Sequence, residues 1–272
     1  MTQNSENAQF QGVKILVKED FMESSKTARE LYQTSYDCYH TGLFETSLEW
    51  IEQAIDANNK ELNYFQLRGM ILIKLNLYEK ALKDFDWVIQ RLANTKLFVE
   101  EEKLLQVEAL LGRIQIYFQQ KEYEGLIQDS NALLLIQRNH WQAFFYRGIG
   151  YYFNQTYAQA LNDLDMAFYL SNQQDKVRPF RALAYFKHGK YALAQKDFEI
   201  AVKQKPHDGV LWYNYGLNAY RMQQFELALQ NFDQALRLGL ATSQTYLYKG
   251  KALQQLGRYT EAEKCRLKAQ EI

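Results

Sequence analysis

The chain has 272 residues, of which 47% are hydrophobic, and its 32 Lys and Arg residues balance its 32 Asp and Glu residues. This composition is that of a soluble globular protein. The zero net charge argues against a general nucleic-acid binder, which needs a basic surplus to displace counterions from phosphates. No stretch approaches the roughly 18 apolar residues needed to cross a bilayer, so we expect no membrane insertion.

The start of the chain shows no basic residues followed by a long apolar core, so no secretory signal is expected. The two cysteines, Cys38 and Cys265, lie at opposite ends of the sequence and imply no disulfide framework. A reducing compartment is the simpler interpretation, and we expect a cytoplasmic protein. Only two prolines occur, which fits a chain that is almost entirely helical.

Residues 1–27 form a leading segment before the first periodic pattern. The first eight residues are polar and without period, which predicts a disordered tail. Residues 10–21, FQGVKILVKEDF, are apolar and rich in β-branched residues. This stretch either covers the apolar edge of the first repeat or docks as an extended peptide in the chain's own groove. Ser24 or Ser25 is the expected N-cap of a helix that starts at Ala28.

Aromatic and small residues recur at one constant interval through much of the chain. We call this interval, which is the spacing from Tyr123 to Tyr157, the period. The recurring rings are Tyr123, Tyr157, Tyr191, Phe225 and Tyr259. The recurring small residues are Gly148, Ala182, Gly216 and Gly250 in one set, and Ala160, Ala194, Ala228 and Ala262 in another. Each period is predicted to form two helices joined by a turn. In one period this turn lies near Gln223 and Gln224, and the other periods have it at the equivalent place. A large side chain on one helix then faces Gly or Ala on the other, so that the two backbones approach closely.

Such a period, built from helix pairs, indicates a repeat array, and the pattern resembles the tetratricopeptide repeat family over about nine tenths of the chain. The resemblance implies an all-α fold, a right-handed superhelical solenoid of about seven helix-turn-helix repeats. Residues 28–95 would hold repeats 1 and 2. Residues 96–106 would be an insert that lengthens the next helix, and residues 107–272 would hold repeats 3–7 as one continuous array.

Two local features predict departures from the regular repeat. The insert, residues 96–106, has Glu, Lys and apolar residues but no Gly or Pro, and its apolar residues continue with helical spacing into the residues that follow. This predicts one long helix from near Val99 to Gln119. Pro179 is expected to delay the start of its helix until about Arg178, because proline is accepted best in the first helical turn.

Residues that could carry out chemistry are scattered. The four His residues have no Cys or carboxylate at metal-ligand spacing, and neither H-E-x-x-H, C-x-x-C nor a Gly-rich phosphate loop occurs. No Ser or Cys is accompanied by a recognisable base. We therefore expect no enzyme activity, no catalytic residue, no metal site and no cofactor.

The first helix of each repeat has a second face that does not contact its partner helix. In the tetratricopeptide repeat family the corresponding face lines a concave groove that holds a peptide. The residues predicted on this face are Phe145, Tyr146, Ile149, Tyr152, Phe153, Phe180, Leu183, Phe186, Tyr213, Asn214, Leu217, Tyr220, Arg221, Leu247, Tyr248 and Lys251. These side chains either pack against the first helix of the next repeat or form an aromatic surface that binds a peptide or helix of another protein.

The family's best-known groove chemistry is a carboxylate clamp of Lys, Asn and Arg for the acidic ends of heat-shock chaperones. Phe145 and Ile149 stand where the first Lys and Asn of such a clamp would be, and only Asn214 fits. The expected function is a non-catalytic scaffold for protein interactions. The alternative is a structural subunit of a multiprotein complex, held by its convex face, long helix and leading segment. RNA binding is disfavoured by the neutral charge.

Overall fold

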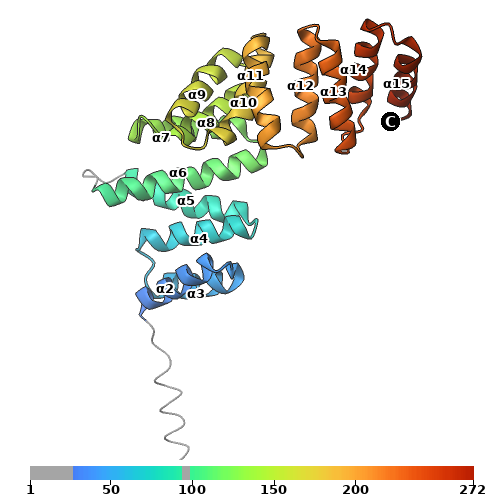
Figure 1. Cartoon of the computed structure of the whole chain (residues 1–272). Helices are drawn as coiled ribbons and strands as arrows, with labels where there is room; N and C mark the ends of the chain where they lie inside the picture. Colours follow the sequence, from blue (N-terminus) through green and yellow to red (C-terminus); the bar gives the residue numbers. More distant parts are fainter. Residues whose placement is uncertain (1–26, 94–98) are drawn as a thin grey trace, which may run out of the picture. The chain divides into compact units, whose positions relative to one another are not determined.

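The computed structural model describes residues 27–93 and 99–272 (Figure 1). These residues form 14 α-helices, α2 to α15, and contain no β-strand. Contacts within the chain divide it into two compact units, residues 1–116 and residues 117–272. The predicted roles of residues 10–21 and the first part of the insert lie outside the described residues.

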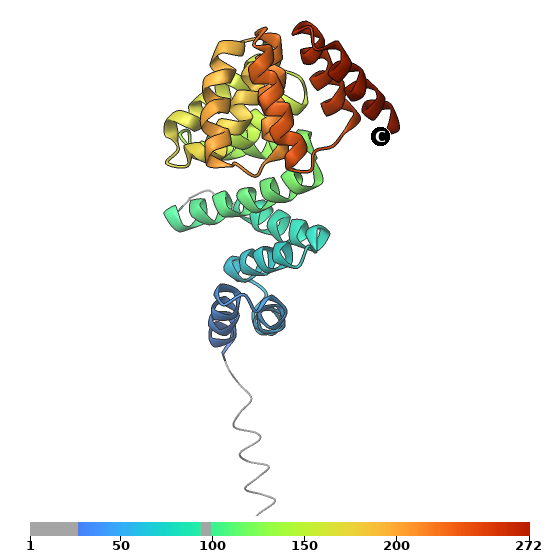
Figure 2. The same cartoon turned by 45° about the vertical axis from the view of Figure 1, so that its right-hand side comes forward.

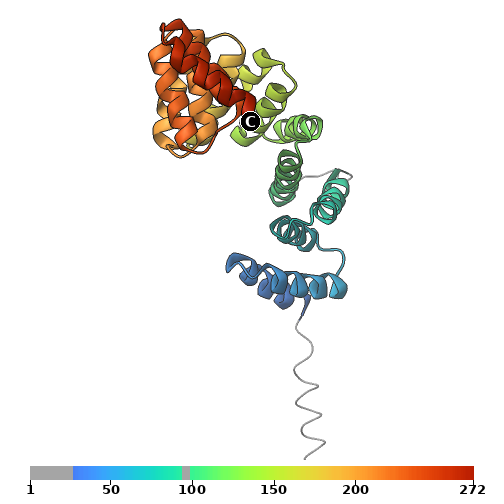
Figure 3. The same cartoon turned by 90° about the vertical axis from the view of Figure 1, so that its right-hand side faces the viewer.

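The first unit consists of successive helix pairs (Figure 3). Its helices are α2 (Ala28–His40), α3 (Phe44–Ala57), α4 (Leu62–Lys74), α5 (Tyr78–Ala93) and α6 (Glu100–Gln120) as far as Ile116. Each of the first two pairs, α2 with α3 and α4 with α5, is joined by a short turn. Helices linked so tightly must run antiparallel.

The second unit repeats the same arrangement, and Figure 2 shows its middle helices running alongside one another. Its helices are α7 (Tyr123–Ile136), α8 (Trp141–Phe153), α9 (Tyr157–Leu170), α10 (Gln174–Lys187), α11 (Tyr191–Gln204), α12 (Gly209–Arg221), α13 (Phe225–Arg237), α14 (Ser243–Gln255) and α15 (Tyr259–Glu271). The chain therefore folds as consecutive helix pairs, as the periodic pattern predicts.

One residue of the turn inside each pair has a left-handed backbone. These residues, with φ between 58° and 83°, are Gly42, Asn76, Lys121, Gln155, Gly189, Gln223 and Gly257. A residue in this conformation ends a helix because its backbone turns away from the helix axis. The predicted turn at Gln223 and Gln224 is confirmed.

The two helices of a pair approach closely where a small residue meets a bulky side chain. A Cβ atom added to Gly216 would lie 2.7 Å from the Phe232 ring, and one added to Gly69 would lie 2.7 Å from the Phe85 ring. Both rings are fully buried. The predicted contact between large and small residues is thus confirmed, and it fixes which stripe of each helix is used for packing.

Two of the predicted helix starts differ from the structure. The N-cap of α2 is Thr27, not Ser24 or Ser25, because its hydroxyl accepts a hydrogen bond from the Glu30 N–H while the Glu30 carboxylate accepts one from the Thr27 N–H. The helix with Pro179 begins at Gln174, well before the expected start near Arg178. Proline removes only one backbone donor there, and the fully buried Val177 holds that turn of the helix in the core.

The long helix predicted from near Val99 to Gln119 is present as α6, with 21 residues. Three glutamates lie in its first turn, where negative charge is favourable beside the unpaired N–H groups. The predicted division into a leading segment, two repeats, an insert and five repeats remains a prediction. The bounds of the helices within it are observed.

Replacing Phe198 by Ala should lower the free energy of unfolding by about 3–5 kcal/mol, because this ring is fully buried between helices and a cavity would remain. Tyr169→Ala is the matched control, since 82% of Tyr169 is exposed and its removal should change stability by less than about 0.5 kcal/mol. Urea denaturation followed by circular dichroism measures both. Equal losses in the two variants would contradict the packing described for Phe198.

Candidate functional site

The predicted binding face comes from four first helices of the second unit, α8, α10, α12 and α14. Two of its predicted residues are buried: Ile149 is fully enclosed and Phe145 is 8% exposed. Neither side chain offers surface to a ligand, so both belong to the core instead. Their positions on α8 also face the neighbouring helices, which sequence spacing alone does not reveal.

The remaining predicted residues keep some contact with solvent. Phe153 is 44% exposed, Leu247 is 37% exposed, and the charged Arg221 and Lys251 are also exposed. The others are half-buried: Tyr146, Tyr152, Phe180, Leu183, Phe186, Tyr213, Asn214, Leu217, Tyr220 and Tyr248. The face is therefore made largely of rings with one side packed and the other accessible.

Several rings connect one first helix to the next. The Phe145 ring lies 5.1 Å from Tyr146 on α8 and 5.5 Å, edge to face, from Phe180 on α10. The Tyr220 ring lies 6.0 Å from Tyr248, which joins α12 to α14. Contacts of this kind stabilise both rings. These residues therefore pack against the first helix of the next repeat, which was one of the two alternatives. This packing also fixes the positions of the ring edges that remain exposed.

The most accessible ring cluster lies at the end of α8. Phe153 stacks on Tyr123 with 4.4 Å between the ring centroids and 10° between the planes. Tyr152 meets Phe153 edge to face at 5.1 Å. Burial, and then the nearby Tyr157, raise the pKa of Tyr152 to about 12, so its hydroxyl stays neutral at physiological pH. It can then donate or accept a hydrogen bond without adding charge.

The polar residues on this face do not form a clamp for a carboxylate. The Asn214 side-chain amide donates to the Val210 carbonyl of its own helix at 2.8 Å. Elsewhere, His140 accepts the Ala143 N–H at its Nδ1 atom as the N-cap of α8, and burial lowers its pKa. His140 thus has a structural partner at the start of this helix.

A row of charged pairs, which the sequence analysis missed, ties the two helices within several pairs. Arg68 binds Asp84, Arg147 binds Asp163 and Arg181 binds Asp197, in each case through two hydrogen bonds of 2.7 to 2.9 Å between residues 16 apart. The three aspartate side chains are only 5% to 8% exposed. We call these pairs, with the contacts of the next paragraph, the Arg–Asp row.

Cations of the Arg–Asp row also reach back to the second helix of the preceding pair. The contacts between these helices are Arg113 with Asp86, Arg147 with Asn131, Arg181 with Asp165 and Lys249 with Asp233. One period after Arg181, Tyr215 replaces the cation, and Asn231 replaces the matching aspartate. The row therefore links helices both within pairs and between pairs, and it is interrupted at Tyr215 and Asn231.

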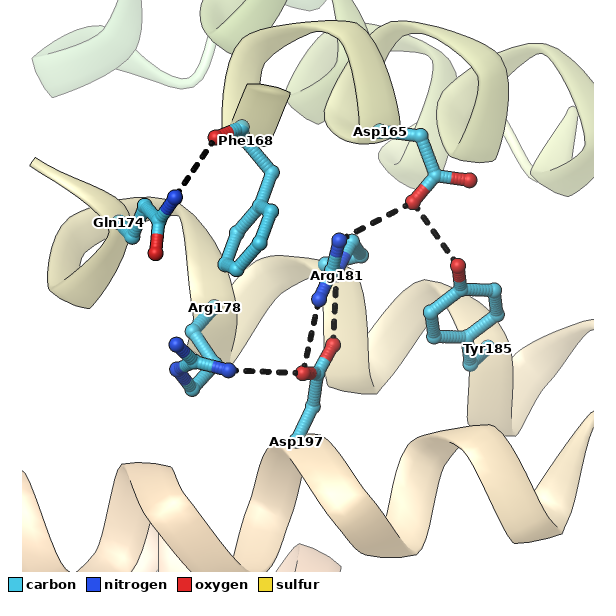
Figure 4. Close-up of polar contacts among 7 residues, drawn as sticks. All are labelled: Asp165, Phe168, Gln174, Arg178, Arg181, Tyr185 and Asp197. Atoms are coloured by element: carbon cyan, nitrogen blue, oxygen red, sulfur yellow. Dashed lines mark hydrogen bonds and ion pairs between the residues drawn. The ribbon is translucent and has the colours of Figure 1, made fainter. Parts of the chain in front are cut away.

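Figure 4 shows the fullest part of the row, around Arg181. Its guanidinium lies 3.6 Å from the Phe168 ring centroid and contacts both Asp197 and Asp165, while Tyr185 donates to Asp165 at 2.8 Å (Figure 4). Burial and this bond to Asp165 raise the pKa of Tyr185 to about 12. With Arg178 on Asp197 at 3.2 Å, two cations balance two carboxylates. The charges in this cluster are balanced among its own members, so the cluster contributes to helix packing.

Two further features of the described residues bear on function. Among residues 27–93 and 99–272, the structure brings together no group of three His, Cys, Asp or Glu side chains that could hold a metal ion. None of the helices in this part of the chain combines the length and the apolar character that a membrane span requires.

Comparisons of sequence agree with this architecture. The family model described as tetratricopeptide repeat matches residues 181–221 and 216–267. Human "Tetratricopeptide repeat protein 16" is 22% identical over 222 residues, which cover 79% of this chain and 22% of that protein. Human "Serine/threonine-protein phosphatase 5" is 33% identical over 107 residues, 39% of this chain and 21% of the phosphatase. The match thus spans about a fifth of each of these relatives.

Solved structures show the same fold. A tetratricopeptide repeat protein from Parabacteroides merdae ATCC 43184 matches with a TM-score of 0.62 and 20% identity, covering 90% of this chain and 92% of that one. MamA from Desulfovibrio magneticus RS-1, solved from residue 41 to its end, matches with a TM-score of 0.56 and 17% identity, covering 61% of this chain and 93% of that one.

Antiparallel helix pairs that recur with a constant period, and that pack on one another in succession within each unit, define an α-helical repeat protein. The family model, the relatives and the structural neighbours all indicate the same kind of repeat, the tetratricopeptide repeat. The part of the chain from residue 181 to residue 267 matches the tetratricopeptide repeat family, and the chain has the fold of tetratricopeptide repeat proteins. This fold supports protein interaction in general, and its members are generally non-catalytic.

Replacing Asp197 by Asn should lower the free energy of unfolding by about 3 kcal/mol, because the side chains of Arg178 and Arg181, 13% and 14% exposed, would lose their main counter-charge. The exposed neighbour Glu199 provides the control: Glu199→Gln should change the value by less than about 0.5 kcal/mol. Replacing Arg181 and Asp197 together by Leu should cost less than Asp197→Asn alone. If all three variants denature at the same urea concentration, the row contributes nothing to stability.

Proposed function

We propose that this protein is a non-catalytic, cytoplasmic scaffold that binds a peptide or helix of a partner protein on the first-helix face of α8, α10, α12 and α14. The observation that carries the proposal is the exposed ring of Phe153, 44% accessible and held flat against Tyr123. An exposed aromatic side chain with a fixed orientation loses little conformational freedom when a partner covers it. Such rings are the usual anchors of protein interfaces.

Half-buried tyrosines of α8 and α12 extend this surface. Tyr146, Tyr152, Tyr213 and Tyr220 each combine an apolar ring with a hydroxyl that can bond to a peptide backbone. Burial raises the pKa of Tyr146, and burial with the neighbouring Tyr248 raises the pKa of Tyr213, so these hydroxyls stay neutral. Binding should therefore rest on covered rings and neutral hydrogen bonds.

Fixed charges are few on the proposed face. The exposed cations are Lys187, Arg221 and Lys251, and the Lys251 ammonium lies 4.8 Å from the centroid of the Tyr248 ring. A contact that depends on burying rings is weakened little by salt, whereas an exposed charge pair is screened. The affinity for the partner should hence change little between low and moderate salt.

A second candidate is a structural subunit of a larger assembly, and one observation favours it. Leu135 on α7 and Tyr169 on α9 are 86% and 82% exposed. They occupy equivalent places one period apart, where the following second helices have Lys203 and Arg237. Helix packing does not require an apolar residue at this position, because Lys203 and Arg237 occupy it in the following pairs. These side chains could hold the chain in an assembly by its second helices.

Binding of the partner captured from native extract, identified and then purified, tests the proposal. Phe153→Ala and Tyr220→Ala should each weaken its affinity by about 2 kcal/mol, with the helical content unchanged. Tyr169→Ala is the control from the outer side of α9 and should leave the affinity unchanged. Loss of binding in the Tyr169 variant alone would favour the structural-subunit candidate. If Phe153→Ala and Tyr220→Ala unfold the chain while residual folded protein still binds, those rings are core residues.

A further inference from the structure

The second helices α7, α9, α11 and α13 of the second unit carry exposed side chains at equivalent places (Figure 1). One set of places, each a period after the last, holds Leu135, Tyr169, Lys203 and Arg237. The set that lies about one helical turn earlier includes Met166 and Ile200. We call these residues the outer band, and all of them are exposed.

The apolar members of the outer band are not required by the repeat. Leu135 and Tyr169 are 86% and 82% exposed, and Met166 and Ile200 are 40% and 41% exposed. The equivalent places of α3 hold Gln53 and Asp56, so polar side chains are accepted there. Large apolar side chains that stay in water at several equivalent places indicate a surface that another molecule covers.

The charged members of the outer band are cations. Lys203 and Arg237 lie in the last turns of α11 and α13, where the unpaired carbonyl groups favour positive charge. That effect does not account for Lys196, which lies in the middle of α11 on the same stripe as Ile200 and Lys203. None of these three cations has an ion-pair partner among the residues that the structure describes.

The carboxylates next to the outer band are turned toward the following pair. Asp165 binds Arg181 of α10, and Asp233 binds Lys249 of α14. Burial, and then the charge of Glu199, raise the pKa of Tyr215, so this carboxylate also lies near the following first helix. The positive charge of the outer band is therefore left for a ligand.

Apolar and basic groups follow one another along the outer band. The members on α7 and α9 are apolar, α11 contributes both kinds, and the member on α13 is Arg237. A ligand that complements this order has apolar residues at one end and carboxylates at the other. A polypeptide segment can carry such an order, whereas the surface of an anionic bilayer has none.

We propose that the outer band binds an acidic segment of a partner protein, in which apolar residues cover Met166 and Tyr169 and carboxylates pair with Lys203 and Arg237. The inference rests on the second candidate for the function, the structural subunit, because the outer band contains Leu135 and Tyr169. It does not use the first-helix face, on which the first candidate depends.

Three synthetic peptides serve as probes on the full-length chain. The ordered peptide, LFLGSGEEDE, spans about 30 Å when it is extended. The scrambled peptide, ELGEFSDLGE, has the same composition, and the basic peptide is LFLGSGKKKK. The ordered peptide should cause saturable NMR shifts at the Tyr169, Lys203 and Arg237 amides and bind roughly ten times more tightly than either of the others. Raising the salt from about 50 to about 300 mM should weaken this binding roughly threefold or more, because exposed charge pairs are screened.

A charge exchange makes the test specific to the outer band. Lys203→Glu combined with Arg237→Glu should reverse the preference, so that this variant binds the basic peptide more tightly than the ordered peptide. Lys80→Glu combined with Lys83→Glu on α5 is the matched control, because it changes the net charge equally and should leave the preference as it is. Tyr169→Ala should weaken the ordered peptide roughly fivefold, and it keeps the test decisive if the charge exchange prevents folding.

Several results would overturn the proposal. One is the absence of shifts with the ordered peptide up to about 1 mM, a concentration at which even weak binding is populated. Equal affinity for the ordered and scrambled peptides is another. The proposal also fails if the charge exchange abolishes binding to phosphatidylserine vesicles, or self-association of the chain, while no peptide binds.

The proposed function is tested separately. Phe153→Ala should leave the affinity for the ordered peptide unchanged, since this ring belongs to the first-helix face. If Tyr169→Ala abolishes capture of the native partner while the ordered peptide does not bind, the structural-subunit candidate stands and the acidic segment is wrong.

Discussion

The close contact between a small residue on one helix and a bulky side chain on its partner is the constraint on which this structure depends. Phe85 shows it most fully, because its ring lies between Gly69 of α4 and Gly112 of α6, and a Cβ on either glycine would collide with it. The contact sets how near two helices come and which stripe of each is buried. The other faces of the first helices are then free for the next pair or for a partner.

A second layer of interactions links the pairs by charge. In the Arg–Asp row, Arg147 and Arg181 each bind an aspartate in their own pair and an oxygen of the preceding pair. Guanidinium groups suit this role because their planar donors can reach two acceptors at once. The row also explains part of the balanced charge of the chain, since cations and carboxylates are used together inside the array rather than separated on its surface.

Much of the fold could be predicted from the sequence because the packing contacts repeat. The constant period placed Gly216 and Phe232 on the correct stripes. Apolar spacing and the absence of Gly and Pro from the insert indicated that α6 would be long. The start of α10 could not be predicted from Pro179, because the core packing of Val177 outweighs the lost hydrogen bond of the proline.

The candidate site was less predictable. Helical spacing put Ile149 and Phe153 on the same face, yet one is buried and the other is 44% exposed, since burial depends on how the neighbouring helix lies. The Arg–Asp row was present in the sequence as Arg147 and Arg181, each followed at the same distance by an aspartate. The periodic pattern of rings and small residues does not reveal it, because an arginine at such a position can equally well face solvent.

The unfolding free energies of Gly216→Ala and Gly250→Ala, measured side by side, test the packing constraint most directly. A Cβ at Gly216 would lie 2.7 Å from the Phe232 ring, whereas one at Gly250 would lie 3.3 Å from the nearest atom, the Ala262 carbonyl oxygen. Gly216→Ala should therefore lose about 1–3 kcal/mol to overpacking. Gly250→Ala should lose less than Gly216→Ala, because its methyl group meets no side-chain atom nearer than Cys265 Cβ at 3.4 Å and alanine has the better helix propensity. Equal effects of the two substitutions would contradict the account.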